Sequence, residues 1–372
     1  MNMKRLALFT ALFFLAGALV FAQLSPDLQT VAVVRLSRAQ NISVKELKDY
    51  VKWMGITKSG NGDGTADALS SQERRDVLDK ISEQLLVCQA AEQEKVSVSD
   101  QEVTQRFNAM IQPIQNYLSQ KNGKAPTDAE VDAELGKQTG MTRAGFKEQV
   151  RRSMANDKYI QTKKQALFQS IKAPTEAEIL ELYNQYKDKS LAEGGFMRPQ
   201  VVRLKMIIVP IRSAAGKSAA QERANALSRQ IGTDPAKFDE VAADSAKPNT
   251  DYVAGEGPYL YKFDQAVEAA DRSFLNMLFT LKQGEVSRVI ERPDGFYIVK
   301  VLESMRAKTL TLDDIYNLGE NPAVTVRQYI GNYLAERRGM ETYQQAYQEI
   351  LADLKKRGSV QVMDNVYNNI SW

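Results

Sequence analysis

The spacing of apolar residues changes twice along the chain, and this change restricts the folds that the chain can adopt. From residue 40 to 189 apolar residues recur at helical spacing, whereas residues 201–210 (VVRLKMIIVP) and 296–302 (FYIVKVL) are short runs rich in β-branched and aromatic residues. Helical spacing returns from about Leu312 to Lys356. Strands that interrupt a helical chain predict a multidomain protein, with a mainly α-helical domain and an α+β domain.

Local signals place the helices of the first part. A serine or threonine followed three residues later by glutamate is the spacing of a capping box, which closes the first turn of a helix. It occurs at Ser43, Ser99, Thr127 and Thr175. The helix after Ser43 is expected to end near Met54, followed by a polar loop over 55–71.

Apolar stripes on these helices predict the core. One helix, from Arg74 to about Lys95, carries a stripe that ends at Cys88, which we expect to be a small core residue. The other expected core positions on this and later helices are Val77, Leu78, Ile81, Leu85, Val103, Phe107, Met110, Ile114, Phe146, Val150, Met154, Ile160 and Leu167.

The α+β part is expected to run strand, helix, helix, loop, helix, strand, strand. Residues 218–231 form the first helix, and Asp234-Pro235 opens the second with an N-cap and a first-turn proline. A loop rich in glycine and proline should span 248–258, with a short helix over 274–281. Strands are expected at 286–290 and 296–302, joined by the turn residues Asp294-Gly295.

Two short β-rich segments near the ends suggest how the parts connect. Residues 30–36 and 359–363 both have strand character. If they pair, both termini lie in the helical domain and the α+β domain is an insertion. We expect a helical domain over 23–189, an α+β domain over 190–305, and a C-terminal helix and strand over 306–372 that pack back on the helical domain.

The first residues resemble a secretory signal. Lys4 and Arg5 precede an apolar stretch from Leu6 to Ala22, and Val20 and Ala22 suit the −3 and −1 positions of a cleavage site. We therefore expect residues 1–22 to be removed after Ala22 and the rest to reside in the periplasm. A retained membrane anchor is the alternative.

Composition excludes several classes of chemistry. The sequence contains no histidine and one cysteine, which rules out Ser–His triads, the usual zinc sites and an intramolecular disulfide. The formal net charge is +3, and Lys4 and Arg5 supply two of these charges, so nothing favours nucleic acid as a partner. We expect no cofactor, nucleotide or metal.

One segment is faintly similar to a calcium-binding loop. The residues concerned are Asn61, Asp63, Gly64 and Asp67. Ser59 and Ser70 stand where such a loop needs Asp and Glu, so we expect no calcium site there.

Residues 201–303 resemble a parvulin domain, the fold of one class of prolyl isomerases. The similarity is carried by Ile207-Ile208-Val209, Phe238-Asp-Glu-Val-Ala242, Leu281-Lys-Gln-Gly-Glu-Val-Ser287 and Gly295-Phe-Tyr-Ile-Val-Lys-Val301. The helical part is similar to SurA- and PrsA-type exported chaperones, through the run from Val96 to Glu102 and the helix Phe146–Arg151. The resemblance implies that the helical domain holds unfolded clients and that the parvulin domain binds proline-containing segments.

The sequence departs from active parvulins at the positions where histidines are usual. Met206 and Tyr297 stand at the two histidine positions, and Lys247 is the nearest match to an expected Asp or Cys. The Gly-Asp-Leu-Gly motif is reduced to residues 255–258, and an expected methionine is Ala270. Phe274 matches the apolar pocket.

The resemblance makes Met206, Phe274, Leu281 and Tyr297 the candidate substrate-binding residues, and makes Met206, Lys247 and Tyr297 degenerate catalytic positions. Each has a plainer interpretation: Met206 and Phe274 as core, Tyr297 as a strand residue with an exposed hydroxyl, and Lys247 as a solvated lysine.

Isomerisation about an X–Pro bond transfers no proton, so histidine is not chemically obligatory. However, both histidines and the neighbouring polar residue are replaced together, and this favours weak or absent catalysis. We expect an exported folding factor that binds unfolded or envelope polypeptides, with outer-membrane proteins among the candidates. An active prolyl isomerase and a structural partner in an envelope assembly are the alternatives.

Overall fold

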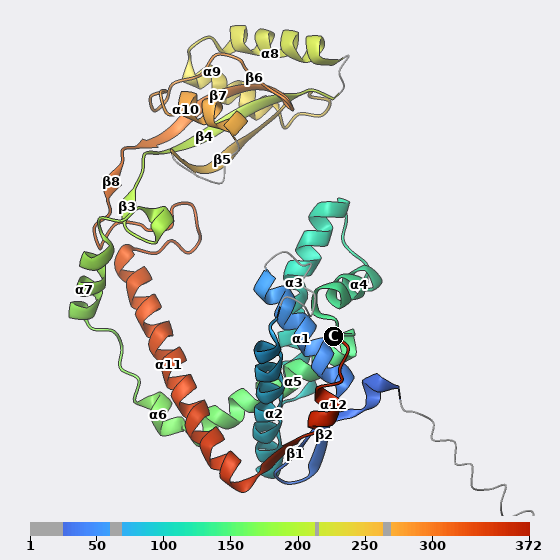
Figure 1. Cartoon of the computed structure of the whole chain (residues 1–372). Coiled ribbons are helices and arrows are strands. Elements are labelled where there is room, and N and C mark those ends of the chain that lie inside the picture. Colours follow the sequence, from blue (N-terminus) through green and yellow to red (C-terminus); the bar gives the residue numbers. More distant parts are fainter. Residues whose placement is uncertain (1–24, 60–68, 213–215, 263–268) are drawn as a thin grey trace, which may run out of the picture. The chain divides into compact units, whose positions relative to one another are not determined.

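The computed structural model describes residues 25–59, 69–212, 216–262 and 269–372, which form two compact units (Figure 1). Unit 1 comprises the chain up to Ile171 together with Gly339–Trp372, and unit 2 comprises Lys172–Arg338. The expected signal segment 1–22 and the calcium-loop residues Asn61, Asp63, Gly64 and Asp67 lie outside the described residues. Within those four ranges, no helix is both long and apolar enough to cross a membrane.

A three-stranded sheet joins the two ends of the chain in unit 1. Strand β1 (Thr30–Arg35) lies between β2 (Ala39–Ser43) and β9 (Ser359–Val362), and both pairings are antiparallel. Ala32 pairs with Val362 and Val33 with Gln361, which confirms the predicted pairing of the two terminal segments. A Cβ on Gly358 would lie 2.7 Å from the carbonyl oxygen of Arg35, so only glycine fits before β9.

The helices of unit 1 begin where the cap signals predicted. Capping boxes are present at Ser99 and Thr127, and Glu46 N–H donates to Ser43 Oγ at 3.1 Å. The first helix continues to Ser59, past the predicted end at Met54. The helices of this unit are η1 (Pro26–Leu28), α1 (Val44–Ser59), α2 (Ser71–Gln93), α3 (Asp100–Asn122), α4 (Asp128–Thr139), α5 (Arg143–Lys163), α6 (Gln165–Gln169), α12 (Asp364–Tyr367) and the part of α11 (Val326–Arg357) that follows Arg338.

The main core of unit 1 is built around α2. Its predicted stripe is buried as expected and packs with residues of β1, α1, α5 and the C-terminal half of α11, including Leu354, which is fully buried. A second, smaller core joins α3 to α4 around Phe107. Met110, predicted to be core, is 45% exposed because it lies at the edge of the narrow α3 stripe that faces α4.

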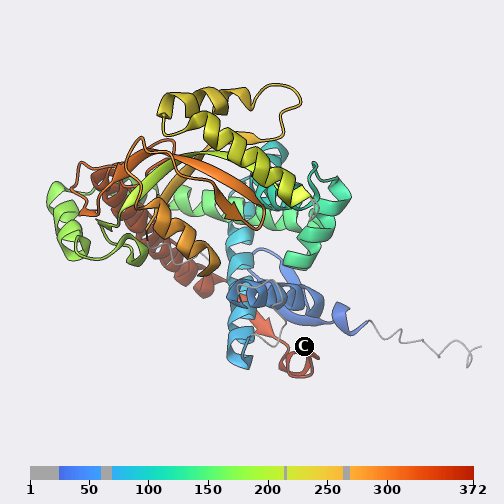
Figure 2. The same ribbon diagram turned by 90° about the horizontal axis from the view of Figure 1, so that it is seen from above.

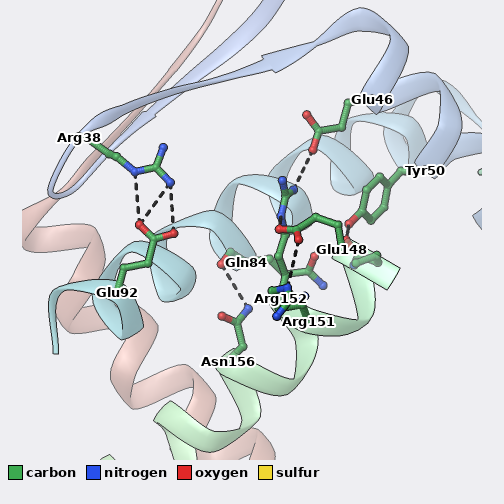
Figure 3. Close-up of polar contacts among 10 residues, drawn as sticks. Arg38, Glu46, Tyr50, Gln84, Glu92, Glu148, Arg151, Arg152 and Asn156 are labelled. Carbon is green, nitrogen blue, oxygen red and sulfur yellow. Dashed lines mark hydrogen bonds and ion pairs between the residues drawn. The ribbon is translucent and has the colours of Figure 1, made fainter. Parts of the chain in front are cut away.

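A network of polar side chains connects α1 to α5 (Figure 3). Arg152 Nη1 lies 3.2 Å from Glu46 Oε1, Arg152 Nε lies 3.3 Å from Glu148 Oε1, and the Tyr50 hydroxyl donates to Gln149. Burial raises the pKa of Tyr50, and burial raises the pKa of the Cys88 thiol to about 11. The thiol is therefore protonated near neutral pH, which agrees with a core role for Cys88.

Unit 2 contains a four-stranded antiparallel sheet in the order β5-β4-β7-β6. Its central strands, β4 and β7, pair from Val201 with Met305 to Pro210 with Gly295, with one bulge between Arg203 and Leu204. The elements of the unit are α7 (Glu176–Tyr186), η3 (Leu191–Glu193), β3 (Met197–Arg198), β4 (Val201–Pro210), α8 (Lys217–Ile231), α9 (Pro235–Asp244), β5 (Val253–Tyr261), α10 (Ala269–Leu278), β6 (Ile290–Arg292), β7 (Gly295–Met305) and β8 (Lys308–Thr309). The predicted fold class, a helical part and an α+β part, is confirmed.

Helices cover both faces of this sheet (Figure 2). Alternate residues of β4 and β7, such as Ile207 and Ile298, pack against α8 and α9 around Phe238. The residues between them, such as Leu204 and Val299, pack against α10. The two faces therefore carry separate apolar cores, and Phe238 is fully buried in the first.

Three expectations for unit 2 were wrong. Residues 253–258, the second part of the expected loop, instead belong to β5, an edge strand in which Gly257 and Pro258 occupy a bulge opposite Leu204, where no ladder N–H is needed. Residues 286–289 are irregular apart from a bridge of Val286 to Lys300, and β6 begins only at Ile290. Residues 312–325 are not helical, and α11 begins at Val326.

A third core in unit 2 explains where the unit divides from unit 1. Ile179 of α7 packs with Phe196, Leu310 and the first turns of α11 at Val326 and Ile330. The units therefore divide at 171/172 and 338/339, whereas the sequence placed the boundaries at 189/190 and 305/306.

Asp314 secures the turn that precedes α11. Its carboxylate accepts from Lys308 Nζ at 2.6 Å, from Thr311 N–H at 2.7 Å and from the Thr311 hydroxyl at 2.8 Å. Burial alone would raise its pKa, but these three donors lower the pKa of Asp314 to about 2.

The substitution Asp314→Asn is expected to destabilise unit 2 by roughly 1 kcal/mol at pH 7, a value reduced for solvent screening. Because the folded pKa lies below the ordinary value of 3.8, the wild-type advantage is full above about pH 4. It should disappear as the pH falls toward 2. Urea unfolding of both proteins at pH 7, 4 and 2.5 measures this, and a difference that persists unchanged at pH 2.5 would contradict it.

Candidate functional site

Four of the five candidate residues meet on one face of the unit 2 sheet. Met206 comes from β4, Tyr297 from β7, Phe274 from α10 and Leu281 from the turn after α10, and all four pack in the same apolar cluster. Met206 and Tyr297 share this face because Met206 pairs with Val299 and Tyr297 with Ile208, so the two lie diagonally across neighbouring strands.

Tyr297 is a buried member of this cluster that makes contacts through both its ring and its hydroxyl. Its ring meets the ring of Phe274 edge to face, with centroids 6.1 Å apart, and only 9% of the residue is exposed. Its hydroxyl donates to Asp294 Oδ2 at 2.5 Å, across the hairpin between β6 and β7. The tyrosine is therefore held in place by both its ring and its hydroxyl, unlike a strand residue with a free hydroxyl.

Arg292 was not anticipated from the sequence. Its guanidinium carbon lies 4.4 Å from the centre of the Phe274 ring and 5.7 Å from that of Tyr297. A guanidinium over an aromatic face is an attractive cation–π contact. The only local signal was its position before the Pro293-Asp294 turn, which does not reveal which ring it would cover.

Met206 is half-buried and points to the same face. A Cβ on Gly257 of β5 would lie 3.3 Å from Met206 Cε, so the glycine leaves the space that the methionine fills. Gly257 of the segment 255–258 thus lies against the side chain that the resemblance puts at the first histidine position.

Lys247 is not brought to this cluster. It follows α9, which packs on the opposite face of the sheet, and its side chain is 68% exposed. Its ammonium lies 2.5 Å from Asp244, and this hydrogen bond raises the pKa of Lys247. Lys247 therefore agrees with the plainer interpretation of a solvated lysine.

The arrangement offers an aromatic and apolar surface beside one cation. It presents no imidazole, because the chain has no histidine. Within the described ranges, no group of three side chains suited to hold a metal ion is present. Any catalysis here would depend on gripping the twisted amide rather than on proton transfer.

In unit 1, a hollow lined by polar side chains lies beside the network of Arg152, Glu46 and Glu148. It measures about 240 Å³ and lies between α1 and α5, lined in part by Lys45, Glu46, Asp49 and Arg152. Its charges are already paired: Lys45 with Asp49 at 2.6 Å, and Arg152 with Glu46 at 3.2 Å. Nothing in its lining calls for a charged ligand.

Comparison with known proteins gives two domain matches. Residues 4–160 match the SurA-like N-terminal domain, and residues 174–317 match the PPIC-type PPIASE domain. Foldase protein PrsA of Staphylococcus aureus (strain Newman) is 33% identical over 82 residues, which cover 22% of this chain and 24% of the relative. The match thus spans about a quarter of that relative's length.

The solved structures that the chain matches are more distant in sequence. One is from a study of PEB4 and the periplasmic protein Cj1289, two SurA-like chaperones of Campylobacter jejuni; it is 18% identical, covers 87% of this chain and 98% of its own, and has a TM-score of 0.30. Another is PrsA from Bacillus subtilis, 18% identical, covering 88% and 93% of the two chains, with a TM-score of 0.27.

Proposed function

The chain joins a SurA-like N-terminal domain to a PPIC-type PPIASE domain, and from this pair of domains we propose that it is an exported folding factor that binds unfolded or envelope polypeptides and has weak or no isomerase activity. The proposal of weak or absent isomerase activity rests on the face of the sheet that holds Phe274. The resemblance to parvulins puts Met206 and Tyr297 at the two positions where histidines are usual, and both residues pack in the apolar cluster on that face.

The chaperone part of the proposal is tested by aggregation. The mature chain, residues 23–372, is expected to suppress aggregation of several chemically unfolded proteins at stoichiometric ratios without ATP. Lack of suppression for every client would reject it. A stable complex with one folded envelope protein, and no affinity for unfolded chains, would instead support a structural role.

The isomerase part is tested by exchange NMR. Uncatalysed X–Pro isomerisation takes tens to hundreds of seconds, so a catalyst is easily seen. The same mature chain is expected to leave exchange in an X-Pro peptide close to the uncatalysed rate. Clear acceleration would favour the second candidate function, an active isomerase, which the packing of Phe274 on the sheet supports.

Export is tested separately. Lys4, Arg5 and the apolar run to Ala22 support secretion and cleavage. Cell fractionation followed by N-terminal sequencing is expected to find the protein in the periplasm, beginning at Gln23. An intact N-terminus in the membrane fraction would indicate a retained anchor.

A further inference from the structure

Arg292 reaches the aromatic residues of the candidate site because of its position in β6. Ile290 pairs with Tyr297 in the β6–β7 hairpin, and Arg292 follows Ile290 by two residues. Side chains two positions apart on a strand leave the sheet from the same face, so Ile290 and Arg292 both project on the face that carries Tyr297. Ile290 packs in the apolar cluster there, and Arg292 extends over it.

The guanidinium of Arg292 covers the ring of Phe274. Its central carbon lies 4.4 Å from the centre of that ring and 5.7 Å from the centre of the Tyr297 ring. Only 21% of the Arg292 side chain is exposed, so the arginine lies along the aromatic surface instead of extending into solvent. Because a charged group stays toward water, the ring face that it covers is the one that a ligand would approach from solvent.

The contacts of the guanidinium with the two rings are individually weak. A cation over an aromatic ring contributes little at a partly exposed site, and Arg292 Nε lies 3.9 Å from Asp294 Oδ1, too far for a hydrogen bond. The other oxygen of Asp294 accepts from the Tyr297 hydroxyl at 2.5 Å. Moving the arginine off the ring requires only a rotation of its side chain, and the bond between Asp294 and Tyr297 can stay intact.

We propose that Arg292 determines access to the candidate site: a proline ring stacks on Phe274 only after the guanidinium has moved aside. This inference rests on the proposed function and on the match of Phe274 to the apolar pocket of parvulins. The apparent affinity for a ligand falls in proportion to the fraction of molecules whose binding surface is free. Two cation–π contacts favour the covered form by about three- to tenfold, so the affinity for proline-containing segments falls by about the same factor.

The covering arginine acts on binding and not on the rate at which a bound peptide isomerises. Met206 and Tyr297 stand where active parvulins have histidines, and they affect the bound peptide. Arg292 affects the fraction of peptide that is bound. The two effects are therefore separable by experiment.

The test measures the affinity of an uncharged tetrapeptide, acetyl-Ala-Leu-Pro-Ala-amide, for the mature chain by NMR titration. Arg292→Thr removes the covering side chain and supplies a residue that suits a strand. We expect this variant to bind the peptide about three- to tenfold more tightly than the wild type does. An affinity within twofold of the wild type, or no detectable binding to either protein, would overturn the inference.

Two controls separate access for proline from a general increase in apolar surface. Arg288→Thr removes an exposed arginine of the same charge four residues earlier, and it should bind the peptide as the wild type does. The matched peptide with alanine in place of proline should gain less than twofold in Arg292→Thr. Equal gains for the two peptides would contradict a role in access for proline.

The gain must also depend on the ring that is covered. In a Phe274→Leu background, Arg292→Thr should change the affinity less than twofold, because leucine has no aromatic face to hold the guanidinium. A gain that persists in this background would place the peptide elsewhere and overturn the inference. Circular dichroism confirms that each variant is folded.

Aggregation assays distinguish the role of Arg292 from the proposed function. If Arg292→Thr gains affinity for the proline peptide but the wild type suppresses aggregation of no client, the chaperone function fails while the role of Arg292 stands. If aggregation is suppressed and the affinity for the proline peptide does not change, the role of Arg292 fails while the chaperone function stands.

Discussion

Replacing Leu354 by alanine is expected to lower the free energy of unfolding of unit 1 by about 2–5 kcal/mol. Leu354 lies on α11, is fully buried, and packs with core residues of β1 and α2 that are more than 260 positions earlier in the sequence. The substitution removes buried surface and leaves a cavity that the surrounding helices close only in part.

Tryptophan fluorescence during urea unfolding measures this effect in unit 1 alone, because the chain's two tryptophans, Trp53 and Trp372, both lie there. Phe238→Ala is the matched control. It opens the core between the sheet and helices α8 and α9 of unit 2, at a cost of about 3–5 kcal/mol. It should shift unfolding monitored by circular dichroism and leave the fluorescence midpoint unchanged. A fluorescence midpoint that does not move in Leu354→Ala would show that α11 does not stabilise unit 1.

Local signals predicted the helices because the physics of a helix start is local. The side chains of Ser99 and Thr127 bond to N–H groups only three residues later, so the capping box can be recognised without knowledge of the rest of the fold. The pairing of β1 with β9 was also foreseeable, because both segments have strand character and unpaired edges are unfavourable.

The errors arose where tertiary contacts outweigh local preference. Gly255, Gly257 and Pro258 favour a loop, but β4 offers an edge on which a bulged strand can form. Residues 312–325 have apolar residues at helical spacing, yet their backbone is fixed by bonds such as Val326 N–H to the Asp314 carbonyl and Tyr316 N–H to the Val324 carbonyl. Such contacts cannot be inferred from a propensity.

The candidate site was only partly foreseeable for the same reason. Alternation along β4 and β7 puts Met206 and Tyr297 on one face, and the amphipathic α10 brings Phe274 to it. Arg292, at the end of β6, lies over the Phe274 ring of α10, a contact that leaves no pattern in the sequence.

The double substitution Met206→His and Tyr297→His is expected to raise the rate of X–Pro exchange at least about tenfold above that of the wild type. The two positions lie diagonally on one face, about 7–8 Å apart for such neighbours, so two imidazoles there can share a hydrogen-bonded network beside Phe274. Single positioned donors can contribute about 10²–10³ in rate, so an increase of at least about tenfold is a conservative expectation.

Exchange NMR on the same X-Pro peptide measures the rate, and Met206→Leu with Tyr297→Phe is the control, because it keeps similar volume without adding an imidazole. That control should remain at the wild-type rate. If the folded histidine variant also remains at the wild-type rate, these two positions are not what limits isomerase activity. The other departures, at Ala270 and in the bulge at Gly255–Pro258, would then limit catalysis, because the proline ring would not be gripped even with the polar network restored.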